Sequence, residues 1–212
     1  MYLSKTPSIL KPLASDLVWD IRTSKKEVFL TFDDGPIPEV TPLVLAILDA
    51  YNAKATFFCV GENVQRNYAV YQDIISRGHA VGNHTFQHEN GWRTSHMSYL
   101  KSALKCREYV DSKLFRPPYG RIRKQQANAL KKRFNLIMWD VLSGDFDVNR
   151  TPEECYNGLV RYTKPGSVVV FHDSLKAKER VLVALPKYLA FLKNEGYSCA
   201  LLTAENTQKR TK

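Results

Sequence analysis

The alternation of short apolar stretches with longer helix-like stretches is the feature that most constrains how this chain can fold. Runs typical of buried strands occur at 27–34, 55–60, 79–84, 114–120, 136–141, 168–173 and 197–202. Between them, helical spacing or helix-start signals occur at 41–48, 62–76, 97–110, 124–133, 151–162 and 179–194. Strands that alternate with helices are typical of a parallel sheet with crossover helices. The pattern predicts either a (β/α) barrel or a doubly wound sheet.

Two of the helices carry start signals of a known kind. Thr41 followed by Pro42 predicts an N-cap with proline at the first helical position. Thr151 and Glu154 have the spacing of a capping box, which predicts a helix that runs on to about Tyr162.

The 212 residues are expected to form one domain, because no flexible linker and no block of charge divides them. We expect an irregular N-terminal segment at 1–17, the folded domain at 18–204 and a basic C-terminal tail at 205–212. No run of about 18 apolar residues is present, so no membrane span is predicted. The first residues lack the apolar core of a signal peptide, which favours a cytoplasmic location and leaves a cell-envelope or secreted one as the alternative.

Charge and cysteine usage narrow the functional classes. The net charge is +10, but the basic residues are scattered, which argues against nucleic-acid binding. A solvated surface or attraction to an anionic polymer explains the charge better. The four cysteines, at 59, 106, 155 and 199, form no CxxC pair, so neither a zinc knuckle nor a redox dithiol is predicted. We expect free thiols, most of them buried.

Polar residues recur where the predicted strands end. They are Asp33, Asp34, His84, Arg116, Asp145 and His172. The C-terminal ends of the strands form the rim at which βα barrels place their chemistry. Two adjacent carboxylates at a strand end are costly unless the site uses them. A turn at Gly35 and Pro36 can bring both to that rim.

The histidines that follow the third strand have the spacing of metal ligands. His84 and His88 lie four residues apart, and a carboxylate from Asp33 or Asp34 would complete an Asp-His-His set. Three protein ligands leave a position open for water, as in catalytic zinc sites. Loop histidines that bind nearby backbone are the plainer alternative. An Fe(II) facial triad is less favoured, because the oxygenases we compare have their carboxylate near the first histidine and an all-β scaffold.

The remaining polar residues fit acid–base chemistry. One carboxylate suffices for the metal, so the other is free to act as a base. Arg116 could orient that base through a paired hydrogen bond. His172 could be the matching acid, with its pKa raised by Asp145. Each of the three could instead belong to a structural ion pair or a capped loop.

Together these residues resemble the five ordered motifs of the polysaccharide deacetylases, carbohydrate esterase family 4. The motifs are Thr31-Phe32-Asp33-Asp34-Gly35-Pro36, His84-Thr85-Phe86-Gln87-His88, Arg116-Pro117-Pro118-Tyr119-Gly120, the stretch 140–146, and Val168-Val169-Val170-Phe171-His172. The resemblance covers about 18–202, and the first three motifs in this order are highly specific. It implies a distorted (β/α)7 barrel with an open groove, in a single α/β domain.

The resemblance also implies roles for individual residues. Asp33 matches the general base, and Asp34 with His84 and His88 matches the ligands of one divalent metal. That metal is usually Zn²⁺, with Co²⁺ or Ni²⁺ in some members. The remaining catalytic matches are Arg116 as partner of the base, the Tyr119 N–H as oxyanion donor, Asp145 as the residue that tunes the acid, and His172 as the acid.

The resemblance further implies an apolar pocket for the acetyl methyl group. It maps to Pro118, Phe146, Val168 and Val170. The family often has tryptophan after the fourth-motif aspartate, where this chain has Phe146. Phenylalanine still supplies an apolar wall, so we expect an altered substrate fit rather than lost activity.

The activity implied is metal-dependent removal of N-acetyl groups from an N-acetylglucosamine-containing glycan, either peptidoglycan or a chitin-like oligosaccharide. One alternative is an O-acetyl ester hydrolase that acts on acetylated xylan, and another is a glycan-binding module without turnover. We expect a monomer whose partner is the glycan, without nucleic acid and without a membrane span.

Overall fold

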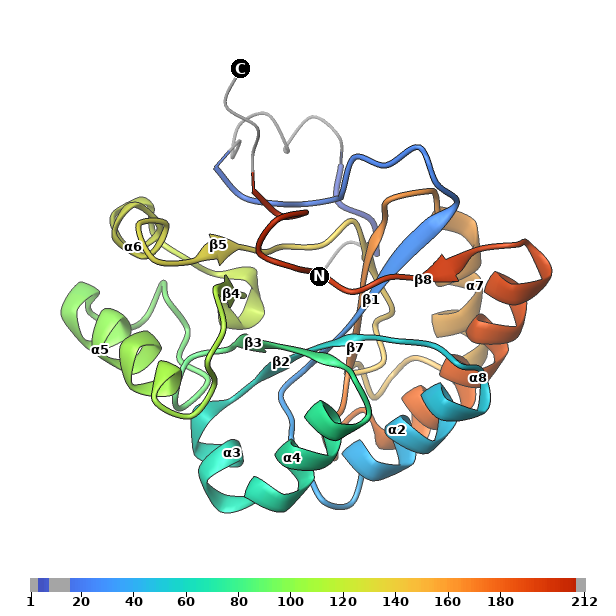
Figure 1. Ribbon diagram of the computed structural model, residues 1–212, viewed down its shortest axis with the longest axis horizontal. Coiled ribbons are helices and arrows are strands. Elements are labelled where there is room, and N and C mark those ends of the chain that lie inside the picture. The colour runs from blue at the N-terminus through green and yellow to red at the C-terminus, as the bar shows by residue number, and fades with distance from the viewer. Residues whose placement is uncertain (1–3, 8–15, 209–212) are drawn as a thin grey trace.

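A computed structural model, which describes residues 4–7 and 16–208, shows a curved parallel sheet with helices packed around its outside (Figure 1). The strand order is β5-β4-β3-β2-β1-β7-β6, with β8 also paired to β1. All the strand pairs are parallel. The strands are β1 (Glu27–Asp33), β2 (Thr56–Cys59), β3 (Ala80–Asn83), β4 (Leu114–Phe115), β5 (Asn135–Leu136), β6 (Val141–Leu142), β7 (Val168–His172) and β8 (Ser198–Cys199). The single-domain α/β barrel expected from the resemblance is confirmed.

Helices connect the successive strands across the outer face of the sheet, except between β5 and β6, as is usual for a parallel βα sheet. They are α2 (Thr41–Ala50), α3 (Gly61–Arg66), α4 (Tyr68–Ser76), α5 (His96–Arg107), α6 (Lys124–Leu130), α7 (Pro152–Tyr162) and α8 (Lys178–Asn194). A short 3₁₀ turn, η1 (Pro118–Gly120), follows β4. None of the helices in the described part of the chain is long and apolar enough to cross a membrane.

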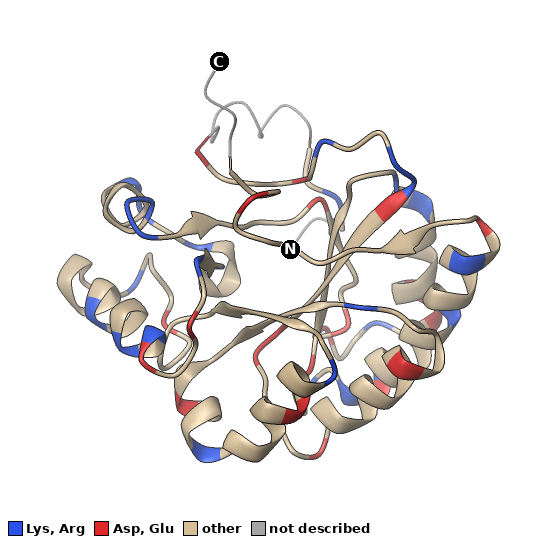
Figure 2. Ribbon diagram, viewed as in Figure 1, with Lys and Arg blue, Asp and Glu red and all other residues tan. Residues whose placement is uncertain are grey.

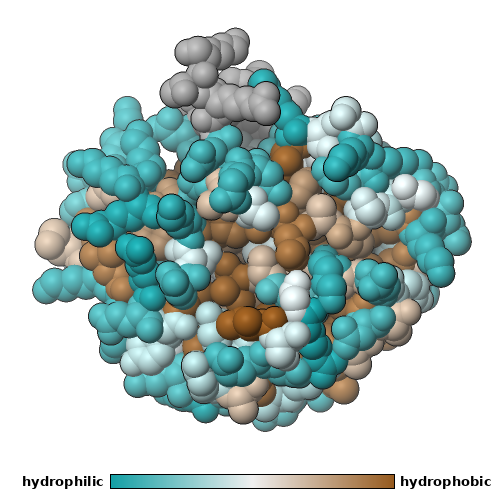
Figure 3. All heavy atoms as spheres, in the orientation of Figure 1, coloured by the Kyte–Doolittle hydropathy of each residue, from teal (hydrophilic) through white to brown (hydrophobic). Residues whose placement is uncertain are grey.

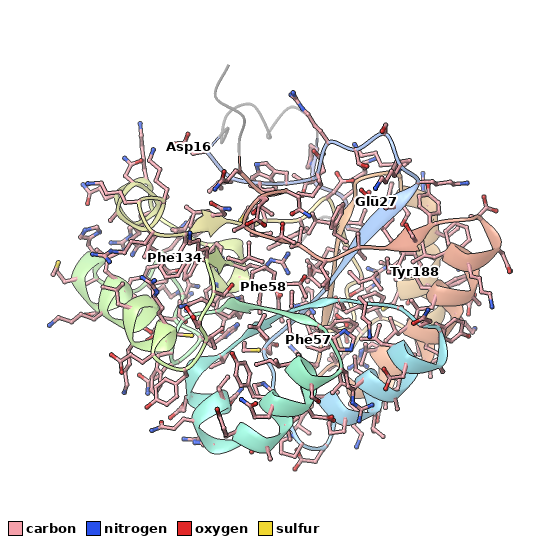
Figure 4. The ribbon with its side chains drawn as sticks, in the orientation of Figure 1. Asp16, Glu27, Phe57, Phe58, Phe134 and Tyr188 are labelled. Atoms are coloured by element: carbon pink, nitrogen blue, oxygen red, sulfur yellow. The ribbon has the colours of Figure 1, made fainter. Side chains whose placement is uncertain are left out.

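Successive residues of each strand face two different cores. On β2, Phe57 packs in the outer core beneath the helices, whereas Phe58 packs in the inner core of the barrel. Figure 4 shows Phe57 on the side of α2 and α4 and Phe58 on the opposite side. Phe32 of β1 stacks on Phe57 at 5.0 Å and on Phe171 at 5.6 Å between ring centroids. These aromatic contacts join the three central strands on their outer face.

The inner face of β1 changes from apolar to polar along the strand. Phe29, Thr31 and Asp33 lie on this face, and all are buried. The register places them beside Val168, Val170 and His172 of β7. This alternation therefore delivers a carboxylate and an imidazole to the C-terminal end of the barrel, above an apolar interior.

The stretch 136–141, predicted to be one strand, is two short strands instead. β5 ends at Leu136 and β6 begins at Val141. Between them the backbone pairs with the N-terminal segment, because Met138 N–H donates to Val18 O at 2.7 Å and Ile137 forms a bridge with Val18. At the start of β6, Lys5 forms an antiparallel bridge with Val141. The predicted boundaries at 17 and 204 stay predictions, and residues 8–15 and 209–212 lie outside the described residues.

Two helix predictions also need correction. The helix expected over 62–76 is divided at Asn67, which has φ −126° and ψ 46° and donates from Nδ2 to the Pro36 carbonyl. Thr41 is the first residue of α2 rather than its N-cap, which is Val40, and the Thr41 hydroxyl donates to Asp173 instead of accepting from the helix backbone. The capping box is confirmed: Thr151 Oγ1 accepts from Glu154 N–H at 3.2 Å, and Glu154 accepts from Thr151 N–H at 2.8 Å.

The distribution of basic residues and the state of the cysteines agree with what the sequence predicts. Lys and Arg residues lie on helices and loops around the whole molecule (Figure 2). On the face in Figure 3, hydrophilic residues cover the periphery and hydrophobic ones show mainly toward the middle. All four cysteines are free, three of them buried and Cys199 half-buried, as predicted.

Candidate active site

The polar residues predicted at the strand ends do meet at one rim of the barrel. Asp33 ends β1 and is the register partner of His172, which ends β7. His84 directly follows β3, Arg116 directly follows β4, and Asp145 lies in the loop after β6. Because neighbouring parallel strands end on the same side, residues far apart in the sequence become neighbours here.

Asp33 forms a buried ion pair with Arg116. Arg116 Nη1 lies 2.6 Å from Asp33 Oδ1, and the guanidinium is fully buried while Asp33 is 4% exposed. Nη1 also donates to Thr31 Oγ1 at 2.7 Å, and Nη2 donates to the Met138 carbonyl at 2.9 Å. The guanidinium carbon lies 4.1 Å from the centre of the Phe58 ring. With four partners, Arg116 holds the Asp33 carboxylate in one orientation.

Asp34 turns to a different set of partners. Its Oδ1 lies 3.1 Å from His88 Nε2 and 3.9 Å from His84 Nε2. The potential ligand atoms of these three residues all lie within 4.8 Å of one another. Asp34 has φ 88° and His88 has φ 57°, a left-handed conformation uncommon for such residues. Backbone strain at both positions is typical of residues that a site holds in place.

The protonation states of this cluster suit a metal. His84 Nδ1 lies 2.8 Å from the Arg116 carbonyl, which can only accept, so Nδ1 carries the proton and Nε2 offers its lone pair. Burial lowers the pKa of His84 to about 4, so the ring is neutral at pH 7. Burial opposes ionisation of Asp34, yet the hydrogen bond with His88 and the charge of His172 bring its pKa well below the usual value. A carboxylate and neutral imidazoles are the donors that Zn²⁺ takes, so the residues fit a divalent cation.

His172 and Asp145 form the second buried pair. His172 Nδ1 lies 2.7 Å from Asp145 Oδ1, and the His172 N–H donates to Asp145 Oδ2 at 2.8 Å. Burial disfavours the imidazolium, but the Asp145 carboxylate outweighs it and raises the pKa of His172 to about 9. His172 is therefore protonated at neutral pH, and its Nε2–H is the proton left for a ligand.

Tyr119 follows His84 and His88 in the chain and precedes the pair of Asp145 and His172. It has a left-handed backbone, with φ 60° and ψ 9°. The residue is 59% exposed, and the centre of its ring lies 4.6 Å from the centre of the His88 ring. Within the part of the chain that the structure describes, no carbonyl or side chain accepts from its N–H. That N–H can therefore donate to a ligand.

The residues predicted to form an acetyl pocket lie at different depths. The Phe146 ring contacts the His172 ring edge-on at 5.1 Å, and Pro118 is buried at the start of η1. Val170 lies on the His172 face of β7 and is fully buried. Val168 lies deeper, in the inner core. Their part in a pocket stays a prediction.

The structure adds a site residue that the sequence interpretation missed. Asp173 is 1% exposed and accepts from Gly35 N–H at 2.9 Å and from Thr41 Oγ1 at 2.6 Å. Its own N–H donates to the Asp33 carbonyl at 3.1 Å. Asp173 thus holds the turn that separates the two carboxylates. Its position directly after His172 was the available signal.

Comparisons with known proteins agree with this geometry. The polysaccharide deacetylase family model matches residues 20–134. A peptidoglycan-N-acetylglucosamine deacetylase of Bacillus cereus is 32% identical over 188 residues, which cover 85% of this chain and 88% of that protein. A chitooligosaccharide deacetylase of Azorhizobium caulinodans is 33% identical over 172 residues, which cover 76% and 80%.

A solved structure is similar over nearly its whole length. The crystal structure of a peptidoglycan N-acetylglucosamine deacetylase in complex with an N-hydroxybenzamide compound superposes with a TM-score of 0.85 at 30% sequence identity. The match covers 93% of this chain and 95% of that one. The resemblance drawn from the five motifs is therefore confirmed, and the chain belongs to the polysaccharide deacetylase family.

Proposed function

We propose that the protein hydrolyses N-acetyl groups of a glycan that contains N-acetylglucosamine, with one divalent cation held by Asp34, His84 and His88. One observation carries the proposal. The adjacent carboxylates have different partners, since Asp33 is paired with Arg116 and Asp34 with the two histidines. Relatives named as peptidoglycan and chitooligosaccharide deacetylases support the substrate class.

The chain's own residues supply the proton transfers. Asp33, held by Arg116, accepts a proton from the water that attacks the acetyl carbon. The Tyr119 N–H donates to the oxygen on which negative charge develops. His172 then gives its Nε2 proton to the amine nitrogen as the carbon–nitrogen bond breaks, so that acetate and a free amine result. A divalent cation, most often Zn²⁺ with Co²⁺ or Ni²⁺ as alternatives, supplies Lewis-acid polarisation of the carbonyl when bound.

The two buried ion pairs, Asp33 with Arg116 and Asp145 with His172, favour an enzyme over a module that only binds glycan. A binding site has no need for a protonated imidazole with a raised pKa next to an arginine-paired carboxylate. An O-acetyl ester hydrolase would use the same residues, but its alcohol leaving group depends less on protonation by His172. The two activities therefore have to be distinguished by testing substrates, because the site residues are the same for both.

Two substitutions test the proposal together. Asp33→Asn keeps the metal set and should abolish acetate release while the metal content stays nearly intact. His84→Ala should lose both, because it removes a ligand. The matched control is Asp111→Asn at an exposed position, which should change neither. Metal content is measured by elemental analysis after chelation and add-back, and acetate release on chito-oligosaccharide, peptidoglycan fragments and acetyl-xylan. Full turnover by Asp33→Asn would rule out the mechanism, and release from acetyl-xylan alone would favour the ester reading.

A further inference from the structure

An exposed tryptophan lies on a rigid loop directly after the predicted metal ligand His88. Trp92 is 57% exposed, and its N–H donates to Asn90 Oδ1 at 3.0 Å. Gln126 Nε2 donates to the Gly91 carbonyl at 3.0 Å, and Arg123 donates to the Trp92 carbonyl. The loop is thus fixed to the segment that leads into α6. A large apolar ring held rigidly in water is a binding surface at low entropic cost.

Four cations belong to the two segments that meet at this ring. Arg93 follows Trp92, and Arg121, Arg123 and Lys124 lie at or just before the start of α6; all four are exposed. The Arg121 guanidinium carbon lies 5.1 Å from the centre of the Trp92 ring, so it stacks on one face of the indole. No carboxylate of the described residues forms an ion pair with any of the four, whereas Arg66, Arg77 and Lys187 elsewhere are paired. We call these five residues the basic platform.

The basic platform lies beside the active site. Its tryptophan follows His88 by four residues, which limits their Cα separation to about 14 Å. Arg121 and Arg123 closely follow Tyr119, whose ring contacts the His88 ring at 4.6 Å. The two loops touch, because a Cβ on Gly91 would lie 2.4 Å from the Arg121 carbonyl oxygen. A sugar next to the one at the metal ligands would therefore meet this surface.

We infer that the basic platform binds a carboxylate-bearing sugar next to the N-acetylglucosamine that is deacetylated, an inference that rests on the proposed function. The indole offers an apolar face to a sugar ring, and guanidinium groups pair with carboxylates in a bidentate way. A net charge of +10 adds general attraction to an anionic polymer. The protein therefore prefers glycans with a carboxylate on the adjoining sugar, such as peptidoglycan, over neutral chitin-like chains.

The test compares an anionic glycan with a neutral one. Acetate release and binding by calorimetry are measured for peptidoglycan tetrasaccharides and for chitotetraose. The double variant Arg93→Gln with Arg121→Gln, which leaves the bond from Arg123 to the Trp92 carbonyl in place, should lower kcat/KM and affinity for the peptidoglycan fragment by about tenfold, and change those for chitotetraose by less than about twofold. The control, Lys132→Gln with Arg133→Gln, removes the same charge from exposed positions after α6 and should leave both substrates unaffected. Trp92→Ala should raise KM for both glycans, with rescue by Trp92→Phe.

Each outcome separates this inference from the proposed function. Equal losses on both glycans, or the same losses in the control, would overturn the basic platform as a carboxylate site. If the metal-loaded protein releases acetate from neither glycan, the proposed function fails. In that case binding measured by calorimetry still tests the inference. Tighter binding of the anionic glycan that is lost in the double variant supports it, and equal binding of both glycans contradicts it.

Discussion

Asp145→Asn gives the sharpest test of how this site holds its acid. Asp145 is fully buried and accepts from both the ring Nδ1 and the backbone N–H of His172. The substitution keeps the size of the side chain but removes the negative charge that faces the imidazolium. Burial, which opposes protonation of His172, is then offset only by the charges of Asp34 and Asp33.

The size of the effect follows from the pKa of His172. The pair raises this pKa from 6.5 to about 9, a difference of about 2.5 units, or about 3 kcal/mol. Without the Asp145 carboxylate, the pKa of His172 falls back toward its ordinary value of 6.5. At pH 8 a group with a pKa of about 9 is about 90% protonated and one with a pKa of 6.5 about 3%, so acid catalysis should fall by up to about thirtyfold.

The assay is the pH profile of kcat/KM for acetate release with saturating metal. The alkaline limb should lie at higher pH in the wild type than in Asp145→Asn, because only the wild type has the Asp145 carboxylate that raises the pKa of His172. Asp147→Asn, in the same loop, serves as the control and should keep the wild-type profile. An alkaline limb at the same pH in both proteins would refute the argument that this carboxylate raises the pKa of His172.

The same pair predicts how stability depends on pH. Because the folded-state pKa of His172 lies above its ordinary value, its stabilising contribution is complete below about pH 6.5 and is lost as pH rises through about 9. Urea unfolding of metal-free protein should show this loss in the wild type and not in Asp145→Asn. Equal pH dependence in both proteins would contradict the assigned cause.

Two further predictions concern stability. Arg116→Ala should lower the free energy of unfolding by about 3–5 kcal/mol, because Asp33 stays buried without its partner. Urea unfolding measures this loss, and a loss below about 1 kcal/mol would contradict the pairing. Gly158→Ala in α7 should stabilise the protein by about 0.5–1 kcal/mol, whereas Gly35→Ala should destabilise it, because its Cβ would lie 1.9 Å from Asp173 Oδ2. Thermal melting compares the two, and a tolerated Gly35→Ala would show that the turn can move.

The features that the sequence predicted well are those with a local physical signature. Strand ends were visible because apolar runs stop at polar residues, and the barrel topology then places those residues on one rim. The capping box at Thr151 was visible because both of its hydrogen bonds depend on a fixed spacing. Alternation along β1 likewise sends Asp33 to the inner face, beside His172.

The features that the sequence did not predict depend on distant partners. Nothing near Leu136 shows that the following backbone pairs with Val18 rather than continuing one strand. Nothing near Thr41 shows that its hydroxyl is used by Asp173, 132 residues later, instead of capping the helix. In both cases a tertiary hydrogen bond replaces the local interaction, because buried polar groups need partners wherever the fold supplies them.

The adjacent carboxylates show how backbone geometry divides a single motif. From the sequence, either aspartate could have joined the histidines. In the structure Asp33 still belongs to β1, so its side chain follows the strand alternation into the barrel and reaches Arg116 at 2.6 Å. Asp34 has left the strand with φ 88°, and its side chain turns toward His88. Asp173 holds the Gly35 N–H that follows, so the turn cannot relax without breaking a buried hydrogen bond. The two aspartates therefore have different partners because β1 ends between them. A variant that makes this turn more flexible should weaken the separate pairing of Asp33 with Arg116 and of Asp34 with the histidines before it unfolds the barrel.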